Sequence, residues 1–378
     1  MDTRSVEKFG TVVIGGGQAG LVMGYYLRRA GERFVILEGD ERVGDSWRCR
    51  YDSLRLFSRP RFASLPGLRI GVGGCPTRDE MADYLERYAA RFELPVRTGT
   101  RVTGVSRDGG EFVVRTGTGE LRADRVVVAA GSHRLPHVPA FADRLNPSIR
   151  QLHSLHYKNP VQLAPGAVLV VGAGNSGTDI ALEAVRTHPT YLAGRHPGQV
   201  PIDIDSARAR PVTPLIMFVF KHVLTLRTPM GRAMRHKVLG HGAPLVRNKI
   251  EQVEAAGVTL LGRISGVRDG KPYTGDDRVF DDVSTVVWCT GSEADHSWLD
   301  LPVFGDDGRP RHRRGVADGE PGLMFLGLDF QFALASSTIQ GLDRDARYLL
   351  RQIRRHRRTT ATQARPGSEP LLEATPAA

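Results

Sequence analysis

Three glycines at a fixed spacing follow an apolar run near the N-terminus: Gly15, Gly17 and Gly20 come directly after residues 12–14. In a dinucleotide-binding turn the first glycine allows a tight turn, the second lets the backbone approach a pyrophosphate, and the third lets a helix pack close to the strand. Glu38 ends the next apolar run, where a carboxylate can accept hydrogen bonds from ribose hydroxyls. This combination predicts a dinucleotide site; the alternative is a glycine-rich turn that binds no ligand.

The same spacing recurs in the middle of the chain, at Gly172, Gly174 and Gly177. Arg195 stands as many residues after Gly177 as Glu38 stands after Gly20. A carboxylate at that position repels a ribose 2′-phosphate, whereas a guanidinium can bind it with two hydrogen bonds. The second turn is therefore predicted to bind NADPH, with His196 as a further candidate contact. The alternative for Arg195 is a surface arginine in an arginine-rich protein.

A chain with both turns is most simply explained as a flavin enzyme. NADPH donates a hydride, and a dinucleotide of the ADP type with a free 2′-hydroxyl accepts it; FAD is the common partner in such an exchange. We therefore expect FAD at the first turn and NADPH at the second.

The elements around the two turns predict an α/β fold. Residues 11–37 and 167–192 each show an apolar run, a glycine-rich turn, a helical stretch and a second apolar run, which is a βαβ unit of Rossmann type. Between them, residues 77–93 are predicted to form a helix with a capping box, and residues 95–128 a hairpin or meander. A final helix is expected from about residue 336 to about 355.

This order predicts two dinucleotide-binding domains, with the NADPH domain inserted into a discontinuous FAD domain. The FAD domain comprises residues 1–150 and 280–355, and the NADPH domain residues 151–279. Within the latter, 198–250 is apolar and basic. It is interpreted as a substrate lid, a membrane-surface helix, or an ordinary helical excursion packed on the NADPH domain. Residues 356–378 are rich in Pro, Ala, Thr and Glu and are expected to be disordered.

Composition excludes several classes of protein. The chain has 378 residues and a formal net charge of +11, but the arginines are scattered rather than clustered on one stripe, so no nucleic-acid partner is expected. The three cysteines form no CxxC pair, so neither a disulfide framework nor a metal site is predicted, and a reducing cytoplasm fits. The start of the chain does not read as a signal peptide, and the apolar run at 214–226 is too short for stable membrane insertion.

Several motifs, taken as a set, resemble a known family. They are GGGQAG at 15–20, GDSW at 44–47, YDSLRL at 51–56, PTRDEMADYLERYA at 76–89, VVVAAG at 126–131, GAGNSG at 172–177 and WCTGSEADHSWL at 288–299. Together they resemble the class B flavoprotein monooxygenases, in the flavin-containing monooxygenase branch that includes the plant auxin-forming enzymes. The resemblance covers roughly residues 10–355.

The resemblance implies FAD and NADPH as cofactors, and a small organic substrate and O₂ as partners. It implies transfer of one oxygen atom from a C4a-(hydro)peroxyflavin to nitrogen, sulfur or a carbonyl carbon. Besides the glycines and Glu38, it assigns FAD contacts to Gln18, Ala19, Asp45, Ser46, Trp47, Ala130, Gly131 and Asp329. It assigns NADPH contacts to Asn175 and Ser176. Catalytic roles would fall to Asn175, near the nicotinamide, and to Arg59, which lies closest to where several relatives carry an asparagine.

The sequence also departs from the family pattern. In the signature FxGxxxHxxx(Tyr/Phe), His153 and Tyr157 fit, but Pro147 and Ile149 replace the phenylalanine and glycine. His153 is interpreted as a structural residue near the domain junction. Two other functions stay open, an NADPH oxidase or flavin reductase without oxygen transfer, and a non-catalytic NADPH-sensing protein. A disulfide reductase is disfavoured because no cysteine pair is present. The oligomeric state is open, with a homodimer as one alternative.

Overall fold

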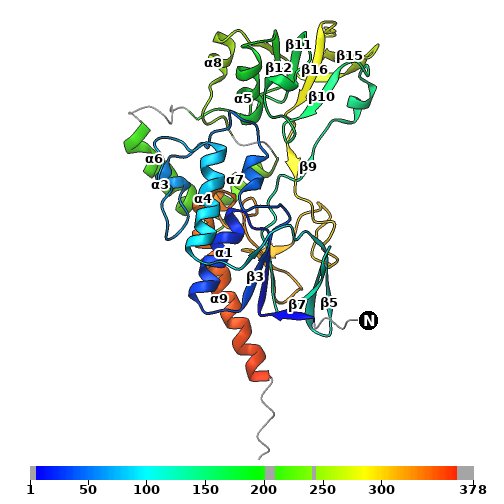
Figure 1. Cartoon of the computed structure of the whole chain (residues 1–378). Coiled ribbons are helices and arrows are strands. Elements are labelled where there is room, and N and C mark those ends of the chain that lie inside the picture. The colour runs from blue at the N-terminus through cyan, green and yellow to red at the C-terminus, as the bar shows by residue number, and fades with distance from the viewer. Residues whose placement is uncertain (1–5, 201–208, 241–243, 364–378) are drawn as a thin grey trace, which may run out of the picture.

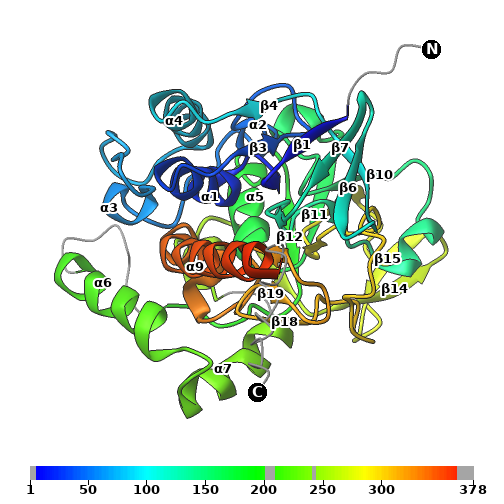
Figure 2. The ribbon, with the colours of Figure 1, turned by 90° about the horizontal axis from the view of Figure 1, so that it is seen from below.

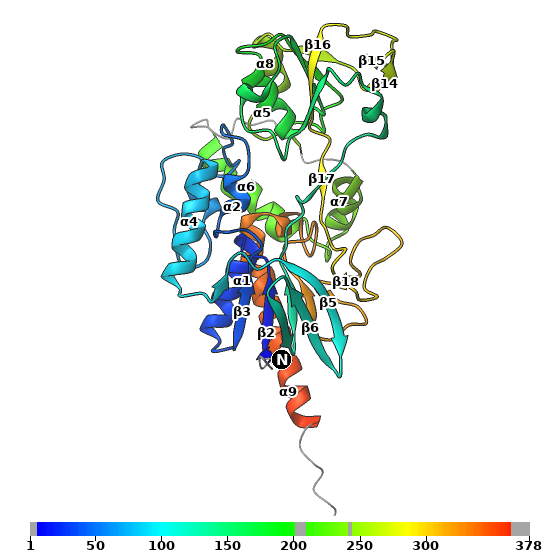
Figure 3. The same cartoon turned by 45° about the vertical axis from the view of Figure 1, so that its right-hand side comes forward.

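The computed structural model describes residues 6–200, 209–240 and 244–363. Two lobes, each built around a largely parallel sheet, lie one above the other in Figure 1. The chain passes between them through two short strands, β9 (Leu135–Pro136) and β17 (Ser292–Glu293), which pair antiparallel. Figure 3 shows this crossing from the side.

The first lobe contains, within the described residues, a seven-stranded sheet in the order β18-β19-β20-β8-β2-β3-β4. Its strands are β2 (Thr11–Ile14), β3 (Phe34–Leu37), β4 (Val96–Arg97), β8 (Val126–Val128), β18 (His312–Arg313), β19 (Val316–Ala317) and β20 (Leu323–Phe325). The strands from β20 to β4 are parallel, whereas β18 and β19 form an antiparallel hairpin at the edge. The central strands are fully buried, as expected for a parallel sheet covered on both faces.

The two faces of this sheet are covered by different layers. Val13, Ile36 and Val127 face the helices α1 (Gln18–Arg29), α4 (Arg78–Arg91) and α9 (Ile339–Gln363). Their neighbours Val12 and Val35 face an antiparallel sheet of β1 (Glu7–Phe9), β5 (Val102–Asp108), β6 (Glu111–Thr116) and β7 (Gly119–Ala123). Alternation along each strand therefore places one core on either side. The meander expected at 95–128 is confirmed.

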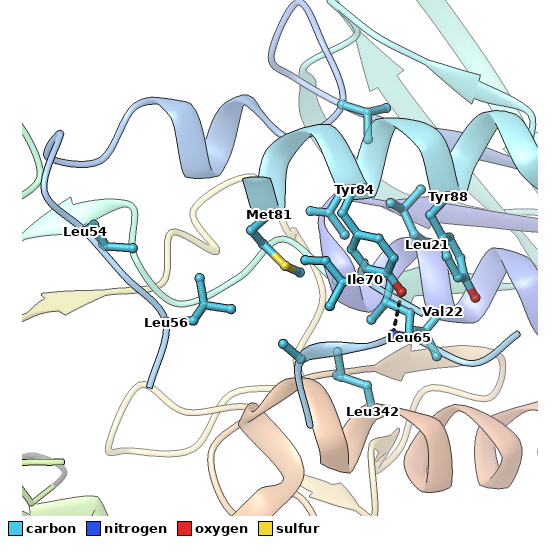
Figure 4. Close-up of a cluster of buried hydrophobic side chains, with 14 of the residues drawn as sticks. Leu21, Val22, Leu54, Leu56, Leu65, Ile70, Met81, Tyr84, Tyr88 and Leu342 are labelled. Atoms are coloured by element: carbon cyan, nitrogen blue, oxygen red, sulfur yellow. Dashed lines mark hydrogen bonds between the residues drawn. The ribbon is translucent and has the colours of Figure 1, made fainter. Parts of the chain in front are cut away.

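Helix α4 confirms the predicted capping box. The Thr77 hydroxyl accepts a hydrogen bond from the Glu80 backbone, and the Glu80 carboxylate accepts one from the Thr77 backbone. The buried face of α4 carries Tyr84 and Tyr88, shown in Figure 4. The Tyr84 hydroxyl accepts from the Leu65 N–H at 2.7 Å, so a polar tip of this apolar cluster fixes the loop beneath α4.

The second lobe contains a five-stranded parallel sheet in the order β10-β16-β11-β12-β13. Its strands are β10 (Arg150–His153), β11 (Ala167–Val171), β12 (Thr190–Ala193), β13 (Thr259–Leu261) and β16 (Val283–Trp288). Helices α5 (Asn175–Ala184) and α8 (Ile250–Ala255) pack on one face. The hairpin of β14 (Ile264–Arg268) and β15 (Lys271–Thr274) and the short helix η1 (Ala140–Arg144) lie on the other.

The expected boundary at residue 280 is displaced by one strand. Strand β16 was expected in the first domain, but it lies between β10 and β11 in the second sheet. Strand β16 pairs in parallel with β11 in the second sheet, just as β8 pairs in parallel with β2 in the first sheet. A Cβ on Gly15 would lie 2.4 Å from the Ala129 carbonyl oxygen, and one on Gly172 would lie 2.3 Å from that of Cys289. The internal repeat therefore extends to a third strand, which the sequence comparison missed because that strand is far away in the chain.

The C-terminal helix differs from its predicted limits at both ends. A short helix, η4 (Leu334–Ser337), precedes α9, and the Ser336 hydroxyl accepts hydrogen bonds from the N–H groups of Phe332 and Ala333. Ser336 thus stabilises the turn that precedes α9. At the other end α9 continues to Gln363. Residues 356–363 were expected to be disordered, and this is wrong because the helical pattern continues; residues 364–378 lie outside the described part.

The segment expected as a lid contains α6 (Ala209–Phe218), the π-helical turn η3 (Val219–Val223) and α7 (Pro229–Gly240). Leu226 N–H donates to the Phe332 carbonyl at 2.8 Å, and Leu334 N–H donates to that of Leu224 at 3.0 Å. Residues 224–226 therefore pack on the first lobe beside η4, whereas residues 244–246 contact α5 of the second lobe, so the segment packs on both lobes and not on the NADPH domain alone. Within the described ranges, no helix combines the length and apolar character needed to cross a membrane.

Candidate cofactor and active site

The first glycine-rich turn lies between β2 and α1 and is shaped by backbone contacts. Gly15 has φ +105°, and a Cβ on Gly20 would lie 1.8 Å from the Gly15 carbonyl oxygen. Both positions therefore require glycine. Gly17 differs, because a Cβ there would meet nothing within 4 Å. It is the N-cap of α1 and supplies no side-chain cap, so the helix N–H groups face an open cradle of the kind that binds phosphate.

Further predicted residues lie around this turn at the carboxyl end of the first sheet. The buried Glu38 carboxylate accepts hydrogen bonds from the N–H groups of Gly16, at 2.7 Å, and Asp40, at 2.9 Å. Trp47, on α2 (Asp45–Arg48), donates its indole N–H to the Gln18 side chain at 3.3 Å. The structure thus brings Trp47 to the first residue of α1, beside the cradle.

The remaining residues assigned to FAD occupy several short segments. Ala130 and Gly131 follow β8, next to the turn, and Gly131 is exposed with φ +77°. Asp329 is exposed after β20, and a Cβ on the nearby Gly327 would lie 3.5 Å from that of Ala19. Asp45 and Ser46 lie at the start of α2, where the Asp45 carboxylate accepts from the Arg42 N–H and pairs with Arg48 at 3.0 Å. Their contacts with FAD stay predictions.

The second turn repeats the construction of the first. Gly172 has φ +109°, a Cβ on Gly177 would lie 1.8 Å from the Gly172 carbonyl oxygen, and a Cβ on Gly174 would meet nothing within 4 Å. Gly174 is the N-cap of α5, again without a side-chain cap. Arg195 is exposed just after β12, and a Cβ on the preceding Gly194 would lie 3.6 Å from the Ala173 nitrogen. The backbone that carries the Arg195 side chain therefore lies beside the second glycine-rich turn, and the exposed His196 follows it directly.

The two residues predicted to be catalytic have different surroundings. The Asn175 amide donates to the Pro244 carbonyl and accepts from the Val246 N–H, both at 3.0 Å, so it holds residues 244–246 against α5. Ser176 follows it in the first turn of α5. Arg59 occupies the N-cap position of the short helix α3 (Pro60–Ala63). Contact of Asn175 or Arg59 with a cofactor stays a prediction.

A buried carboxylate that sequence reasoning missed links the two lobes. Asp179 of α5 accepts a hydrogen bond from the Tyr51 hydroxyl at 2.8 Å and pairs with Arg247 at 2.7 Å; Asn248 is a third partner. Burial of the Tyr51 hydroxyl, together with the charge of the Asp179 carboxylate beside it, raises the pKa of Tyr51. The signal available in the sequence is an acidic residue two positions after Gly177, on the face of α5 that packs inward. A carboxylate buried in this way needs hydrogen-bond donors or a cation as partners, because burying an unpaired charge is costly.

We expect Asp179→Ala to lower the free energy of unfolding by about 3 kcal/mol, because it leaves a cation and a buried hydroxyl without their acceptor. Tyr51→Phe removes only one hydrogen bond and should cost about 1 kcal/mol. Urea denaturation of both variants measures the difference. Equal losses would show that the carboxylate does not link the lobes.

His153 lies at the junction of the lobes, as expected. Its Nδ1 accepts from the Leu155 N–H at 3.2 Å, so the ring is neutral with hydrogen on Nε2, which donates to the Gly291 carbonyl at 3.0 Å. Burial lowers the pKa of His153 below its ordinary value of 6.5. The ring thus stabilises the junction in its neutral form.

The lowered pKa of His153 sets a pH dependence. Because the unfolded chain binds the proton more readily, the stabilisation is fully present above pH 6.5 and is lost as the pH falls through the lower folded-state value. We expect His153→Gln to show a shallower fall in unfolding free energy between about pH 7 and about pH 5. Denaturation curves at several pH values, with His236→Gln as an exposed control, measure this. An unchanged slope in His153→Gln would contradict it.

Comparisons with known proteins agree with this geometry. The model of the pyridine nucleotide-disulphide oxidoreductase family matches residues 12–213. An uncharacterized oxidoreductase CzcO-like of Geobacillus kaustophilus is 37% identical over 357 residues, covering 91% of this chain and 98% of the relative. Indole-3-pyruvate monooxygenase YUCCA1 of Oryza sativa is 35% identical over 183 residues, covering 47% of this chain and 45% of that enzyme. Among solved structures, a flavin-containing monooxygenase from Stenotrophomonas maltophilia matches with a TM-score of 0.77 and 27% identity, over 95% of this chain and 100% of that one.

Two glycine-rich turns, each in front of an uncapped helix on a Rossmann-type sheet, are typical of an oxidoreductase that binds two dinucleotides. The chain belongs to the pyridine nucleotide-disulphide oxidoreductase family. Within it, the chain is a class B flavin monooxygenase, with FAD and NADP(H) as cofactors and O₂ and a small molecule as substrates. None of the three cysteines forms a disulfide, and the described residues contain no cluster able to hold a metal ion.

Proposed function

We propose that the first turn binds FAD, that the second binds NADPH, and that the chain transfers one oxygen atom from O₂ to nitrogen, sulfur or carbonyl carbon of a small organic substrate. The observation that carries this proposal is the difference between two otherwise matching turns. At the first turn, the Glu38 carboxylate accepts hydrogen bonds from the N–H groups of Gly16 and Asp40. At the equivalent position of the second turn, the residue is an exposed arginine, Arg195.

The residues present fit both cofactors. At each turn a Cβ on the middle glycine would enter open space, which leaves room for a pyrophosphate against the helix N–H groups. Glu38 would accept the ribose hydroxyls of FAD, and Arg195 would bind the 2′-phosphate of NADPH. When bound, the reduced flavin supplies the reaction with O₂. The protein's part is to position the two nucleotides, to exclude water and to hold the substrate.

The position of the apolar segment supports a substrate site between the lobes. Residues 224–226 pair with residues 332–334 of the first lobe, while Asn175 of the second lobe holds residues 244–246. The stretch between them thus spans both cofactor domains. We propose that it contributes to substrate selection as a lid, and that the protein is cytoplasmic.

Oxygen transfer is tested by supplying isotopically labelled O₂ and NADPH with a panel of amines, sulfides and ketones. The proposal predicts a product that contains one labelled oxygen atom, formed at the expense of H₂O₂. NADPH consumption with stoichiometric H₂O₂ for every substrate would instead identify an NADPH oxidase or flavin reductase. Binding of NADPH without consumption would identify a sensing protein.

A further inference from the structure

A groove lined by charged and aromatic residues lies apart from both glycine-rich turns. It has a volume of about 840 Å³ and runs between the β18–β19 hairpin, α9 and the loop that follows η3. Figure 2 shows the hairpin beside α9. Its apolar walls are Leu226, Phe332 and Tyr348. Neither glycine-rich turn contributes a residue, so the groove is separate from the predicted cofactor contacts.

The charged lining of this groove is predominantly positive. Three guanidinium groups, those of Arg227, Arg313 and Arg314, line it together with one carboxylate, that of Asp318. His312 also lines the groove, and burial lowers its pKa, which favours the neutral ring. The groove therefore carries an excess of positive charge next to aromatic surface.

Arg314 stands at a position where the backbone does not favour arginine. Arg313 and Val316 pair across the hairpin, so Arg314 and Gly315 form its two-residue turn. Their φ values are +54° and +91°, as a type I′ turn requires. Asn-Gly is the favoured pair in such a turn, whereas a long side chain at positive φ is strained. The turn itself thus gives no reason for arginine.

The side chain of Arg314 is instead placed by two aromatic rings of the groove. Its guanidinium carbon lies 3.8 Å from the centre of the Phe332 ring and 4.1 Å from that of Tyr348. Its Nε is buried and has no hydrogen-bond partner within the described residues. Burial lowers the pKa of Arg314, and the nearby Asp345 offsets this only in part. Asp345 also forms an ion pair with Arg344 at 3.2 Å, so the charge of this carboxylate is shared between Arg344 and Arg314.

We propose that this groove binds a small organic acid, with its carboxylate on Arg314 and Arg227 and its apolar body against Leu226, Phe332 and Tyr348. A planar guanidinium that is stacked on rings keeps its N–H groups for an oxyanion, and carboxylate is the oxyanion that an apolar body most simply carries. Inorganic phosphate fits the charge but leaves the aromatic walls unused.

The groove is also linked to the first lobe's cofactor turn. The Gln331 side chain donates to the Arg314 carbonyl at 3.3 Å and accepts from the N–H groups of Gly327 and Leu328. Gly327 in turn lies beside Ala19 of the first turn. A bound acid therefore lies one short segment away from the predicted FAD site, but its binding does not depend on oxygen transfer.

The test is isothermal titration of the full-length, FAD-loaded protein with benzoate, benzamide and inorganic phosphate. Benzoate is expected to bind. Benzamide, which lacks the negative charge, and phosphate, which lacks the apolar ring, are expected to bind about tenfold more weakly or worse. Arg314→Asn creates the Asn-Gly pair that the turn favours, so it removes the guanidinium while keeping the hairpin. It should weaken benzoate about tenfold or more, and Arg227→Gln should also weaken it.

Arg268→Gln is the matched control, since it removes a ring-stacked arginine of the second lobe, 4.7 Å from Tyr273, that is not part of the groove. It should leave benzoate affinity unchanged. The proposal is overturned if Arg314→Asn, with an unchanged melting temperature or a higher one, binds benzoate as wild type does. It is also overturned if benzamide or phosphate binds as tightly as benzoate.

Discussion

Replacing Gly17 by alanine is expected to give a folded protein that no longer retains FAD. Gly17 has φ −74°, which an L-residue adopts freely, and a Cβ there meets no protein atom within 4 Å. The methyl group therefore costs the fold little, but it occupies the space where a pyrophosphate would approach the N–H groups of α1. Loss of two charge-assisted hydrogen bonds, about 3 kcal/mol in total, weakens FAD about 100-fold. Flavin fluorescence after dialysis measures the affinity, and circular dichroism the fold.

Two further variants make the experiment selective. Gly174→Ala makes the equivalent change at the second turn, where φ is −85° and the space is again open. It should retain FAD and lose NADPH. Gly73→Ala changes an exposed glycine with nothing within 4 Å, away from both turns, and should bind both cofactors normally. If Gly17→Ala retains FAD as wild type does, the first turn is not the flavin site.

Arg195→Glu should reverse the preference between NADPH and NADH. The substitution removes the group proposed to bind the 2′-phosphate and introduces the carboxylate that the first turn carries at the equivalent position, Glu38. Loss of a bidentate, charge-assisted contact is worth about 3 kcal/mol, so the affinity for NADPH should fall about 100-fold, while that for NADH changes little. Rates of anaerobic flavin reduction with each nucleotide, over a range of concentrations, measure both affinities.

The control for this variant is Arg186→Glu. Arg186 is exposed beyond the opposite end of α5, so the same charge change takes place on the same lobe but far from the second turn. It should leave the preference for NADPH almost unchanged. A similar loss of NADPH affinity in both variants would mean that overall charge, and not a contact from Arg195, selects the nucleotide.

Local patterns in the sequence predicted the parts of the site that are built from consecutive residues. The two turns, the capping box at Thr77 and the meander each depend on neighbours within a few residues, and each is found in the structure. The relation between Glu38 and Arg195 also came from spacing alone, because two copies of one unit place equivalent positions at equivalent distances.

The features that sequence reasoning missed depend on contacts between distant segments. Strand β16 pairs with β11 across more than a hundred residues, although its ending resembles that of β8. Asp179 accepts a hydrogen bond from Tyr51 of the other lobe. The Arg314 guanidinium stacks on Tyr348 of α9 and on Phe332 of the segment that precedes α9. Neither the burial of a charged residue nor an arginine at positive φ can be recognised from the sequence, because both depend on partners that are distant in the chain and close only in the folded structure.

The most direct test of the two-nucleotide assignment is an anaerobic titration of the purified protein with NADPH, followed through the visible absorbance of the flavin. We predict a yellow protein whose flavin absorbance is bleached by an equimolar amount of NADPH, with NADH much slower at the same concentration. A protein that cannot be loaded with FAD, or whose flavin absorbance does not change when NADPH is added, would contradict the assignment of FAD to the first turn and NADPH to the second.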